Sequence, residues 1–387
     1  MLGPLTRKKP WQMRIVFDLN PVLVHRFSGF HTYGVGLLEG FESLDERPEF
    51  VLFHSKRFSE KARRIKERLG SWAELGSTPV KMRWLENFWR YASYPALQYF
   101  TGQFEVYHCC HHLMPPTKGK PRVLTVYDLR RYIIPEFYQE SRLGLFEFAV
   151  RRADHFVAIS EATKNDLCRI FDICEEKVDV VHLAADKIFE PLTDFEKQRT
   201  KKQLADKLGL ELENYLLVFS SPDRRKNIPR TIEAFLSVRD VLGDNYKLVV
   251  IGNVPRYDEA FKSIAWDKAK DGIILTGALE QIQDLFRCAN GLVFASLYEG
   301  FGIPILEAFR CGVPVITSNC SSMPEVGGDA AAYVDPYSVE SIAESMLRLC
   351  SDSETRRKLI DGGFRRGQEF SWKRTASETL DVYKKFV

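Results

Sequence analysis

The chain has 387 residues, of which 45% are hydrophobic and 28% are charged, and its formal net charge is +3. This length is too great for one ordinary hydrophobic core and predicts two domains. The small net charge excludes nucleic acid as a partner. No apolar run reaches the roughly 18 residues that a membrane-spanning helix needs. The eight cysteines form no C-x-x-C pair, so we expect reduced, mostly buried thiols in a cytoplasmic protein.

Residues 1–12 are basic and lack an apolar core, so we expect an extension with little structure rather than a signal peptide. From Met13 onward, strand-like runs alternate with helical patterns, and this alternation predicts a parallel sheet covered by helices. The strand-like runs of the first half are 14–19, 50–54, 106–110, 122–127, 155–159 and 178–182. The helical patterns of this half lie near 33–46, 57–69, 85–100, 142–153 and 161–171.

The second half repeats this architecture without a detectable sequence repeat. Its strand-like runs are 215–219, 247–251, 273–275, 291–295, 313–317 and 331–334. Its helical patterns lie near 228–242, 256–270, 280–289, 304–311, 338–351 and 353–369. A last helical pattern at 371–386 places four apolar side chains on one face, namely Trp372, Ala376, Leu380 and Tyr383.

A charged stretch at 186–206 separates the two halves and is the best candidate for a linker region. We therefore predict an N-terminal domain at 13–190, a C-terminal domain at 191–370 and a closing helix at 371–387 that returns to the N-terminal domain. The fold class is α/β, with two Rossmann-like, doubly wound domains. Ligands of such sheets bind beyond the carboxyl ends of the strands, so donor and acceptor molecules would meet in a cleft between the domains.

The stretch from Glu299 to Glu307 combines a glycine loop with two carboxylates. It follows the strand-like run 291–295 and leads into the helical run 304–311, with Pro304 at the first helical position. The backbone N–H groups of such a loop, and the positive end of the helix dipole, favour a phosphate group. Carboxylates accept hydrogen bonds from hydroxyl groups and repel phosphate. The stretch therefore predicts a ligand with phosphate in its middle and polyol at both ends, such as a nucleotide sugar.

A basic cluster of Arg224, Arg225 and Lys226 follows the strand-like run 215–219. By itself such a cluster is typical of a solvated charge run ahead of a helix. Its position just past a strand is also where a phosphate clamp belongs, because charge-assisted hydrogen bonds would stabilise a departing diphosphate. We assign this role to Arg225 and Lys226 before Arg224.

From about residue 13 to its end, the chain resembles the retaining glycosyltransferases of family 4, of the group 1 or mannosyltransferase type. These enzymes have the GT-B fold. In the C-terminal half the matching segments follow the family's order and spacing at 221–227, 275–279, 295–308, 311–315 and 324–326. In the N-terminal half the matching segments, 28–33, 126–129 and 159–161, are less specific.

The resemblance implies roles for individual residues. It makes Glu299, Lys226 and Arg225 catalytic, with Glu299 on the donor sugar hydroxyls, and it places Glu307 on the nucleotide ribose. The other donor-binding residues would be Gly29, Tyr127, Ser221, Thr276, Gly277, Leu279, Gly300, Phe301, Gly302 and Ile303. His111 and His112 would lie near the acceptor. The family's usual chemistry also implies that no metal or other cofactor takes part, and the sequence has no Asp-x-Asp to bind one.

Two positions depart from the family's pattern. Tyr127 replaces the family's histidine beside the donor sugar, which keeps open a non-catalytic relative that binds nucleotide sugars. Ser221 replaces an arginine that many members carry, which leaves Arg225 and Lys226 as the cationic clamp.

Two further motifs have competing interpretations. The run from His108 to His112 invites a metal site, but adjacent strand residues point to opposite faces and no second cluster completes a ligand set. Gly34, Gly36 and Gly40 nearly match the dinucleotide fingerprint, which keeps an NAD(P)-dependent oxidoreductase as a remote alternative. These glycines lie too far inside a predicted helix, so we assign the tight turn to Gly29.

The segment 56–69 holds seven basic and two acidic residues, and its apolar residues fall on one helical face. This pattern is typical of a solvated helix, and the alternative is a helix that docks on anionic lipid. The aromatic-rich stretch 84–100 is assigned mostly to the core, although together the two segments favour contact with a membrane surface.

These observations predict a retaining, metal-independent transferase that moves a hexose from a nucleotide sugar to a glycan or lipid-linked acceptor. Polysaccharide or lipopolysaccharide assembly is the expected setting. The Glu-Gly-Phe-Gly-Ile-Pro form at 299–304 is similar to that of many bacterial mannosyltransferases and favours mannose from GDP-mannose. The expected location is the cytoplasm, with peripheral contact at the inner face of the cell membrane.

Overall fold

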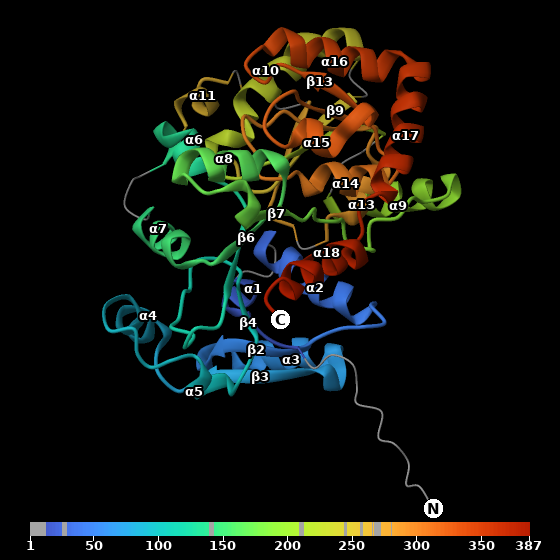
Figure 1. Cartoon of the computed structure of the whole chain (residues 1–387). Coiled ribbons are helices and arrows are strands. Elements are labelled where there is room, and N and C mark those ends of the chain that lie inside the picture. The colour runs from blue at the N-terminus through green and yellow to red at the C-terminus, as the bar shows by residue number, and fades with distance from the viewer. Residues whose placement is uncertain are drawn as a thin grey trace, which may run out of the picture.

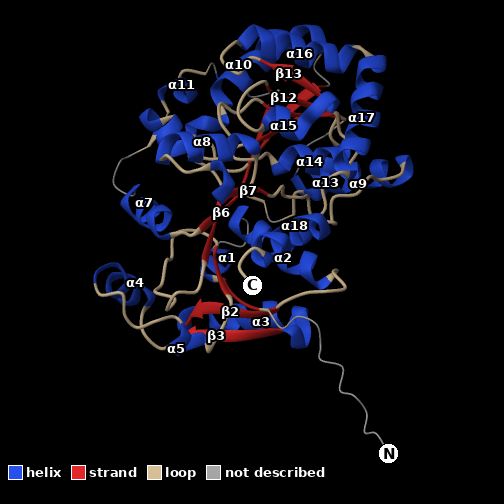
Figure 2. Ribbon diagram, viewed as in Figure 1, coloured by secondary structure: helices blue, strands red, loops and turns tan. Residues whose placement is uncertain are grey.

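The computed structural model shows two α/β units, each built on a parallel sheet with helices on both faces (Figures 1 and 2). The residues that it describes are 13–24, 29–138, 143–208, 213–243, 246–255, 258–264, 266, 272–279 and 281–387. The predicted extension 1–12, Ser28 and about half of the predicted helix 256–270 lie outside these residues. Within the described part of the chain, every helix is too short or too polar to cross a bilayer.

The N-terminal sheet has seven strands in the order β3-β2-β1-β4-β5-β6-β7. They are β1 (Arg14–Asp18), β2 (Glu49–Ser55), β3 (Ala73–Thr78), β4 (Val106–Cys109), β5 (Arg122–Val126), β6 (His155–Ala158) and β7 (Val178–Val180). Successive residues of a strand enter opposite cores, since Ile15 and Phe17 pack on one face and Val16 on the other. Strands buried on both faces read as nearly continuous apolar runs, which is why six of the seven strands are recognisable from sequence.

Helices cover both faces of this sheet. They are α1 (Asn20–Val24), α2 (Gly29–Glu42), α3 (Ser59–Leu69), α4 (Met82–Tyr91), α5 (Gln98–Thr101), α6 (Arg130–Ile133), α7 (Leu143–Arg152) and α8 (Glu161–Phe171). The predicted helix 85–100 is divided into α4 and α5, because Pro95 lies between them. α8 begins where Ser160 accepts a hydrogen bond from the Thr163 N–H, an ordinary N-cap.

The C-terminal sheet has six strands in the order β10-β9-β8-β11-β12-β13. They are β8 (Asn214–Phe219), β9 (Tyr246–Ile251), β10 (Ile273–Gly277), β11 (Gly291–Phe294), β12 (Val315–Ser318) and β13 (Ala331–Val334). The helices of this unit are α10 (Ile228–Leu242), α11 (Glu259–Lys262), α13 (Gln283–Cys288), α14 (Ile303–Arg310), α15 (Met323–Gly327), α16 (Val339–Ser351) and α17 (Ser353–Gln368). All six strands occur where the sequence pattern predicts them.

The charged stretch between the units is more ordered than a linker. Most of it lies in α9 (Asp194–Leu208), and α9 packs against α13 of the C-terminal unit. The Arg287 guanidinium also donates to the backbone oxygens of Ile188 and Glu190, which fixes the start of this stretch. A polar composition therefore marks the change of unit without implying an unstructured chain.

The closing helix α18 (Trp372–Lys384) lies against α2 of the N-terminal unit (Figure 1). A Cβ atom at Gly36 would lie 2.2 Å from the Trp372 ring, and one at Gly40 would lie 2.1 Å from the Trp372 backbone oxygen. The near-fingerprint glycines therefore allow close helix packing and do not form a dinucleotide loop. At the other end of α18, the Tyr383 hydroxyl contacts the buried His108 ring on β4.

Candidate active site

Glu299 lies at the centre of a buried cluster of charges beyond the carboxyl ends of β8 and β11. It is 7% exposed, and its two carboxylate oxygens take separate cations. The Lys226 ammonium lies 2.6 Å from Oε1, and the Arg225 guanidinium pairs with Oε2. Both cations come from the short 3-10 turn Arg224–Lys226 that follows β8. The glycine loop and the basic cluster, 73 residues apart in sequence, thus meet in one place.

The charges in this cluster are strongly coupled. Burial alone would raise the pKa of Glu299, but Arg225 and Lys226 lower it to about 2, so the carboxylate is ionised. Burial lowers the pKa of Lys226, and the Glu299 charge offsets this only in part. The Asp223 carboxylate accepts from Arg225 Nε at 3.1 Å and holds the guanidinium in position. The cluster is a preformed, largely desolvated pair of cations held between the carboxylates of Glu299 and Asp223.

The loop after Glu299 is fixed by hydrogen bonds to its backbone oxygens. Ser322 Oγ donates to the backbone oxygens of Glu299 and Phe301, at 2.9 and 2.6 Å. Gly302 has a φ of +122°, a conformation that favours glycine, and it directly precedes α14. The chain therefore turns sharply and presents the N-terminal end of a helix next to the charge cluster. Such an end attracts anions through its free N–H groups and its dipole.

Glu307 lies on α14, one turn after Ile303. Burial, and then the charge of Asp186, raise the pKa of Glu307 to about 8. Among the described residues, its carboxylate has no hydrogen bond or ion pair. Such a group gains by accepting hydrogen bonds from a ligand's hydroxyls.

The turn after β10 lies on the same edge of the sheet. Gly277 accepts a hydrogen bond from Gly252 N–H at 2.8 Å, and Thr276 Oγ1 donates to the Gly277 oxygen at 2.9 Å. A Cβ atom at Gly252 would lie 2.1 Å from the Ser220 oxygen, so the end of β9, which bonds this turn, packs closely against the loop that contains Ser221. Beside it is a cavity of about 390 Å³, lined by Pro222, Arg224, Gly252, Asn253, Val254, Pro255, Asp258, Leu275 and Gly277. Leu279 packs against the core instead.

Aromatic rings cover the facing edge of the N-terminal sheet. The Tyr127 ring lies 4.6 Å from the Phe30 ring and 5.3 Å from the Tyr33 ring, and Phe30 also contacts His111 at 4.9 Å. The Tyr127 hydroxyl is buried, and among the described residues no polar group meets it with hydrogen-bond geometry. His111 is exposed and His112 is half-buried, and the surrounding protein removes enough hydration to lower the pKa of both rings, that of His111 to about 3, so both are neutral at pH 7.

The two edges touch each other directly. Gly300 packs so tightly on the N-terminal unit that a Cβ atom there would lie 1.8 Å from the Tyr127 oxygen. The Gly300 oxygen accepts a hydrogen bond from Ser160 Oγ at 2.7 Å, and the Tyr298 hydroxyl donates to Asp166 at 2.9 Å. Tyr127 and the glycine loop therefore form two walls of one site.

A second set of contacts joins the units beside this site. The Glu325 carboxylate accepts from the backbone N–H of Glu161, at the start of α8, and pairs with His182 at 2.6 Å. The Tyr138 hydroxyl donates to Asp223 at 2.6 Å, so the residue that orients Arg225 also links the units.

The structure thus brings together most of the predicted residues. Glu299, Arg225, Lys226 and Gly300–Gly302 adjoin Tyr127, while Arg224 turns away and pairs with Asp258 at 2.9 Å. Gly29 is the first residue of α2, and a Cβ atom there would meet nothing within 4 Å. Among the described residues, no interaction joins Gly29 to the charge cluster. Its neighbour Phe30 contacts Tyr127 and His111 instead.

Sequence reasoning missed Phe30, Asp223 and Tyr298 as parts of this site. Phe30 and Asp223 do lie inside segments that match the family, beside residues that were predicted. Tyr298 directly precedes Glu299, so proximity to a predicted residue was a usable signal.

Across the described residues, no group of three His, Cys, Asp or Glu side chains is placed to hold a metal ion, and His108 bonds Thr125 Oγ1 at 2.6 Å instead.

Comparison with known families assigns both units. The family model described as "Glycosyltransferase Family 4" matches residues 30–187, and "Glycosyl transferases group 1" matches residues 200–366. The O-antigen chain mannosyltransferase B of Escherichia coli is 25% identical over 96% of this chain and its own full length. The serotype-specific mannosyltransferase WbdA of Escherichia coli is 30% identical over 72% of this chain, which corresponds to 33% of WbdA.

Solved structures share the fold over nearly the whole chain. A sucrose-phosphate synthase from Thermosynechococcus elongatus superposes with a TM-score of 0.71 at 17% identity, covering 97% of this chain and 99% of that one. WaaG, a glycosyltransferase of lipopolysaccharide biosynthesis, superposes with a TM-score of 0.68 at 16% identity, covering 95% and 99%. The predicted GT-B fold is confirmed. The chain belongs to the group 1 glycosyltransferases of family 4, and it is a glycosyltransferase.

Proposed function

We propose that this glycosyltransferase transfers mannose from GDP-mannose, with retention of anomeric configuration, to a glycan or lipid-linked acceptor of a cell-surface polysaccharide. The observation that carries the proposal is the cluster of Glu299, Arg225 and Lys226 beside the N-terminal end of α14. It combines the two features that a nucleotide sugar requires, namely cations with free N–H groups for the diphosphate and a carboxylate for the sugar hydroxyls.

The donor would lie along the carboxyl edge of the C-terminal sheet. The cavity beside Gly277 has room for a base, and Glu307 lies free to accept from ribose hydroxyls. The diphosphate would then reach Arg225, Lys226 and the loop at Gly300–Gly302. The sugar would extend toward Tyr127, because Gly300 and Tyr127 are in contact.

The transfer would depend mainly on stabilising the leaving group. When the bond between the anomeric carbon and the phosphate oxygen breaks, negative charge collects on the diphosphate. Arg225, Lys226 and the α14 end are already desolvated and in place, which is the arrangement that lowers such a barrier most. We assign no protein nucleophile. The acceptor hydroxyl would attack from the face that the diphosphate leaves, and its proton would pass to the departing phosphate oxygen.

The rings around Tyr127 support binding of sugar hydroxyl groups. His111 and His112 are neutral at pH 7 and offer hydrogen-bond donors and acceptors, and Phe30 and Tyr127 supply apolar ring faces. The relatives named as O-antigen mannosyltransferases support mannose as the transferred sugar and polysaccharide or lipopolysaccharide assembly as the setting. We place the enzyme in the cytoplasm, at the inner membrane face where lipid-linked acceptors are exposed.

A donor panel tests this proposal. Thermal shifts with UDP-, GDP-, ADP- and dTDP-sugars should show the largest stabilisation with GDP-mannose, followed by GDP release when a lipid-linked or glycan acceptor is added. GDP release should persist in EDTA, because we propose that no metal takes part. Turnover that survives Glu299→Ala combined with Lys226→Ala would contradict the proposal. A strong shift with another nucleotide sugar would replace the donor and leave the site assignment intact.

A further inference from the structure

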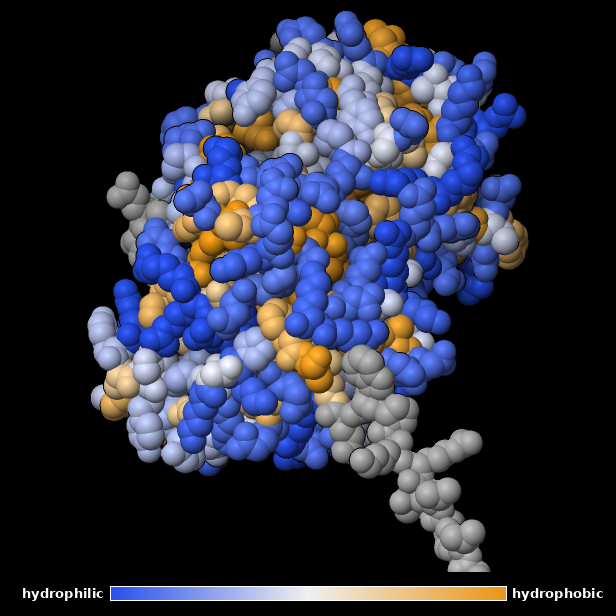
Figure 3. All heavy atoms as spheres, viewed as in Figure 1, coloured by the Kyte–Doolittle hydropathy of each residue, from blue (hydrophilic) through white to orange (hydrophobic). Residues whose placement is uncertain are grey.

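Helix α4 exposes an aromatic face that the transfer reaction does not use. Leu85 and Trp89 are buried in the N-terminal core, each 1% exposed. On a neighbouring face Trp84 is 63% exposed, Phe88 53% and Tyr91 79%. The spacing of these three residues places them along one side of the helix. α4 projects from the N-terminal unit in Figure 1, and pale and orange spheres reach the surface over it in Figure 3. A contiguous exposed patch of this kind marks an interaction site.

The aromatic surface continues beyond the end of α4. Tyr94 and Tyr99 are each 62% exposed, and their rings meet edge to face at 6.0 Å. The Lys118 ammonium lies 4.7 Å above the Tyr99 ring. Lys118 belongs to the loop at 116–121, which lines a neighbouring pocket. Aromatic and cationic side chains are therefore continuous across this surface.

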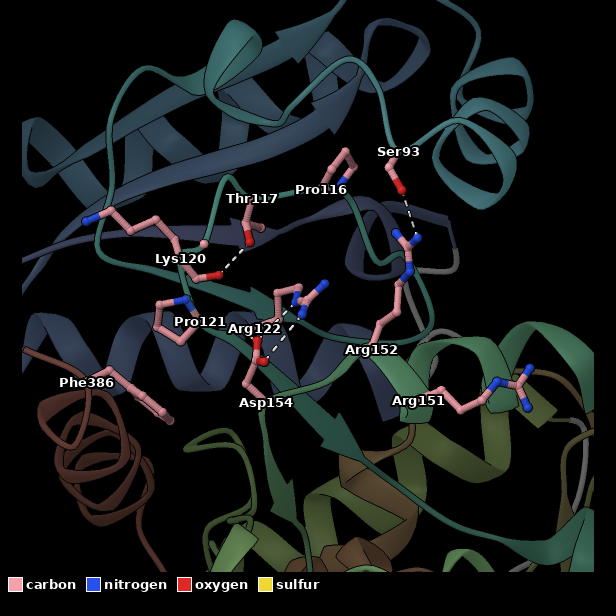
Figure 4. A pocket seen from close by; sticks show the side chains of 11 residues that line it. Ser93, Pro116, Thr117, Lys120, Pro121, Arg122, Arg151, Arg152, Asp154 and Phe386 are labelled. Atoms are coloured by element: carbon pink, nitrogen blue, oxygen red, sulfur yellow. Dashed lines mark hydrogen bonds and ion pairs between the residues drawn. The ribbon is translucent and has the colours of Figure 1, made fainter.

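The pocket beside the patch has a volume of about 710 Å³ and is basic (Figure 4). It lies at the amino ends of β5 and β6, the sheet edge opposite to Tyr127. Lys120, Arg122, Arg151 and Arg152 line it together with a single acid, Asp154, which pairs with Arg122 at 3.0 Å. Arg152 donates to Ser93 Oγ at 3.0 Å and to the Trp89 oxygen at 3.3 Å, so it joins the pocket to the end of α4.

The charges of the whole surface favour an anionic partner. Across residues 81–91, the loop at 116–121 and the pocket there are eight basic residues (Lys81, Arg83, Arg90, Lys118, Lys120, Arg122, Arg151 and Arg152) and two acidic ones (Glu86 and Asp154). Tryptophan and tyrosine settle at the headgroup level of a bilayer, and each nearby lysine or arginine adds about 1 kcal/mol of attraction to anionic lipid. We propose that α4 and this basic pocket dock the enzyme on a bilayer of anionic phospholipid, with the aromatic side chains among the headgroups and a lipid phosphate in the pocket.

The structure favours α4 over the basic helix α3 as the docking element. Ala62 and Leu69 of α3 are buried, and Phe58 and Ile65 pack against the core. The apolar face of α3 is thus already used, and its exposed face carries charges alone. α3 offers electrostatic attraction without a side chain that can enter the bilayer, whereas α4 offers both.

The position of α4 connects docking with the reaction, and this part of the inference rests on the proposed function. α4 follows the carboxyl end of β3, and its Glu86 acts electrostatically on Asp18 at the carboxyl end of β1. The first half of α4 therefore lies near the edge of the sheet that also carries His111 and Tyr127. A lipid-linked acceptor could then enter the cleft while its lipid remains in the membrane.

Vesicle flotation tests the docking without any sugar donor. The full chain should float with vesicles of phosphatidylcholine and phosphatidylglycerol, and not with phosphatidylcholine alone. Trp84→Ser, Phe88→Ser and Tyr91→Ser in one chain should weaken binding at least tenfold, and so should Lys120→Glu with Arg151→Glu. Arg63→Glu with Arg64→Glu on α3 reverses the same number of charges as the pocket pair and should change binding less than threefold. Vesicles should also shift the tryptophan emission of the wild-type chain to shorter wavelength, and less so that of Trp84→Phe.

Several outcomes would overturn the inference. These are absence of binding to anionic vesicles, unchanged binding by the triple serine variant, or dissociation of a dimer by that variant, which would make the patch an interface between copies. Inorganic phosphate that stabilises the chain through Lys120 and Arg151 without any vesicle binding would make the pocket a site for free anions. GDP-mannose turnover with a soluble acceptor is measured separately, so failed docking and failed glycosyl transfer remain distinguishable.

Discussion

The two edges that face each other across the cleft are built from different chemistry. The C-terminal edge holds ionised, mutually neutralising groups, with Lys226 2.6 Å from Glu299 and a helix end beside them. The N-terminal edge holds neutral histidines and aromatic rings, with Tyr127 4.6 Å from Phe30, beside the ion pair of Asp128 and Arg130 that follows β5. The difference indicates a division of labour, in which one edge stabilises a charged leaving group and the other contacts uncharged sugars.

The largest effect should come from removing the charges of the C-terminal edge. Arg225→Ala with Lys226→Ala should lower donor turnover about a thousandfold, because two preorganised donors to the diphosphate are lost. Together the two changes leave the buried Glu299 without either of its cations, so Glu299→Gln is added to keep the fold. The measurement is the initial rate of nucleoside diphosphate release, with circular dichroism as the check on folding. Lys358→Ala, whose ammonium pairs with Glu354 on the exposed face of α17 at 2.7 Å, is the matched control and should stay within about threefold.

The contact between the edges should matter next. Gly300→Ala forces a Cβ atom against the Tyr127 oxygen, from which it would be 1.8 Å away, and the backbone there cannot give way without separating the units. A displacement of about 1 Å at a reacting centre is worth about a hundredfold in rate, and we expect a loss of that size in kcat. Gly144→Ala has only the Arg90 side chain, at 3.9 Å, near its added atom and should leave kcat unchanged. Equal rates for the two variants would show that the contact is incidental.

Glu307 should make donor affinity depend on pH. Its pKa is about 8 in the donor-free chain, and ribose hydroxyls bond its charged form, so donor binding releases a proton. The Kd of the donor should therefore fall as pH rises from 6 to 8, by up to about tenfold per unit, and level off above 8. Calorimetry in buffers of different ionisation enthalpy measures the released proton directly. Glu307→Gln should remove both the pH dependence and the proton release.

The same group predicts the sign of a stability change. The native carboxyl keeps its proton up to a pKa of about 8, whereas the unfolded chain releases it near 4.5. Between these values the native state binds more protons, so the free energy of unfolding falls as pH rises from 4.5 to 8. Denaturation by urea should show this fall in the wild-type chain and a smaller one in Glu307→Gln. A fall of the same size in both chains would assign the titration to another group.

The smallest effect should come from the N-terminal edge. Tyr127→Phe removes a buried hydroxyl that has no hydrogen-bond partner among the described residues, so stability should change by less than about 1 kcal/mol. Turnover should fall only severalfold, because the ring itself lines the site. Tyr33→Phe is the comparison, since it breaks the 2.9 Å hydrogen bond to Thr125 and should lower stability by about 1 kcal/mol. The reverse order of stabilities would mean that the Tyr127 hydroxyl has a partner in solution.

The loop of the C-terminal edge was predictable from sequence because its parts are neighbours along the chain. A strand, a glycine loop and a helix start follow one another between 291 and 310, and each has its own signal in composition. The salt bridges of Glu299 were not predictable from spacing, because Arg225 lies 74 residues away in sequence. Only the resemblance to a family, and then the topology that sets β8 beside β11, brought these residues together.

The N-terminal edge and the docking surface on α4 were harder to predict for a physical reason. Trp84, Phe88 and Tyr91 belong to residue types that are usually buried, and only the packing of Leu85 and Trp89 decides which face of α4 turns inward. β3 was missed because Glu74, Gly76 and Ser77 interrupt its apolar pattern at an edge of the sheet. Phe30 was missed because its contacts with Tyr127 and His111 are made between distant segments.

One titration tests the central claim, that the C-terminal edge binds a nucleoside diphosphate through Arg225, Lys226 and the loop after Glu299. Isothermal titration of the donor-free chain with GDP should give one site per chain. The affinity should fall at least a hundredfold in Arg225→Ala with Lys226→Ala and Glu299→Gln, and should not change in Lys358→Ala, which removes an exposed charge from α17. Equal affinity in the wild-type and triple-variant chains, or no binding of GDP, UDP, ADP or dTDP, would contradict the account.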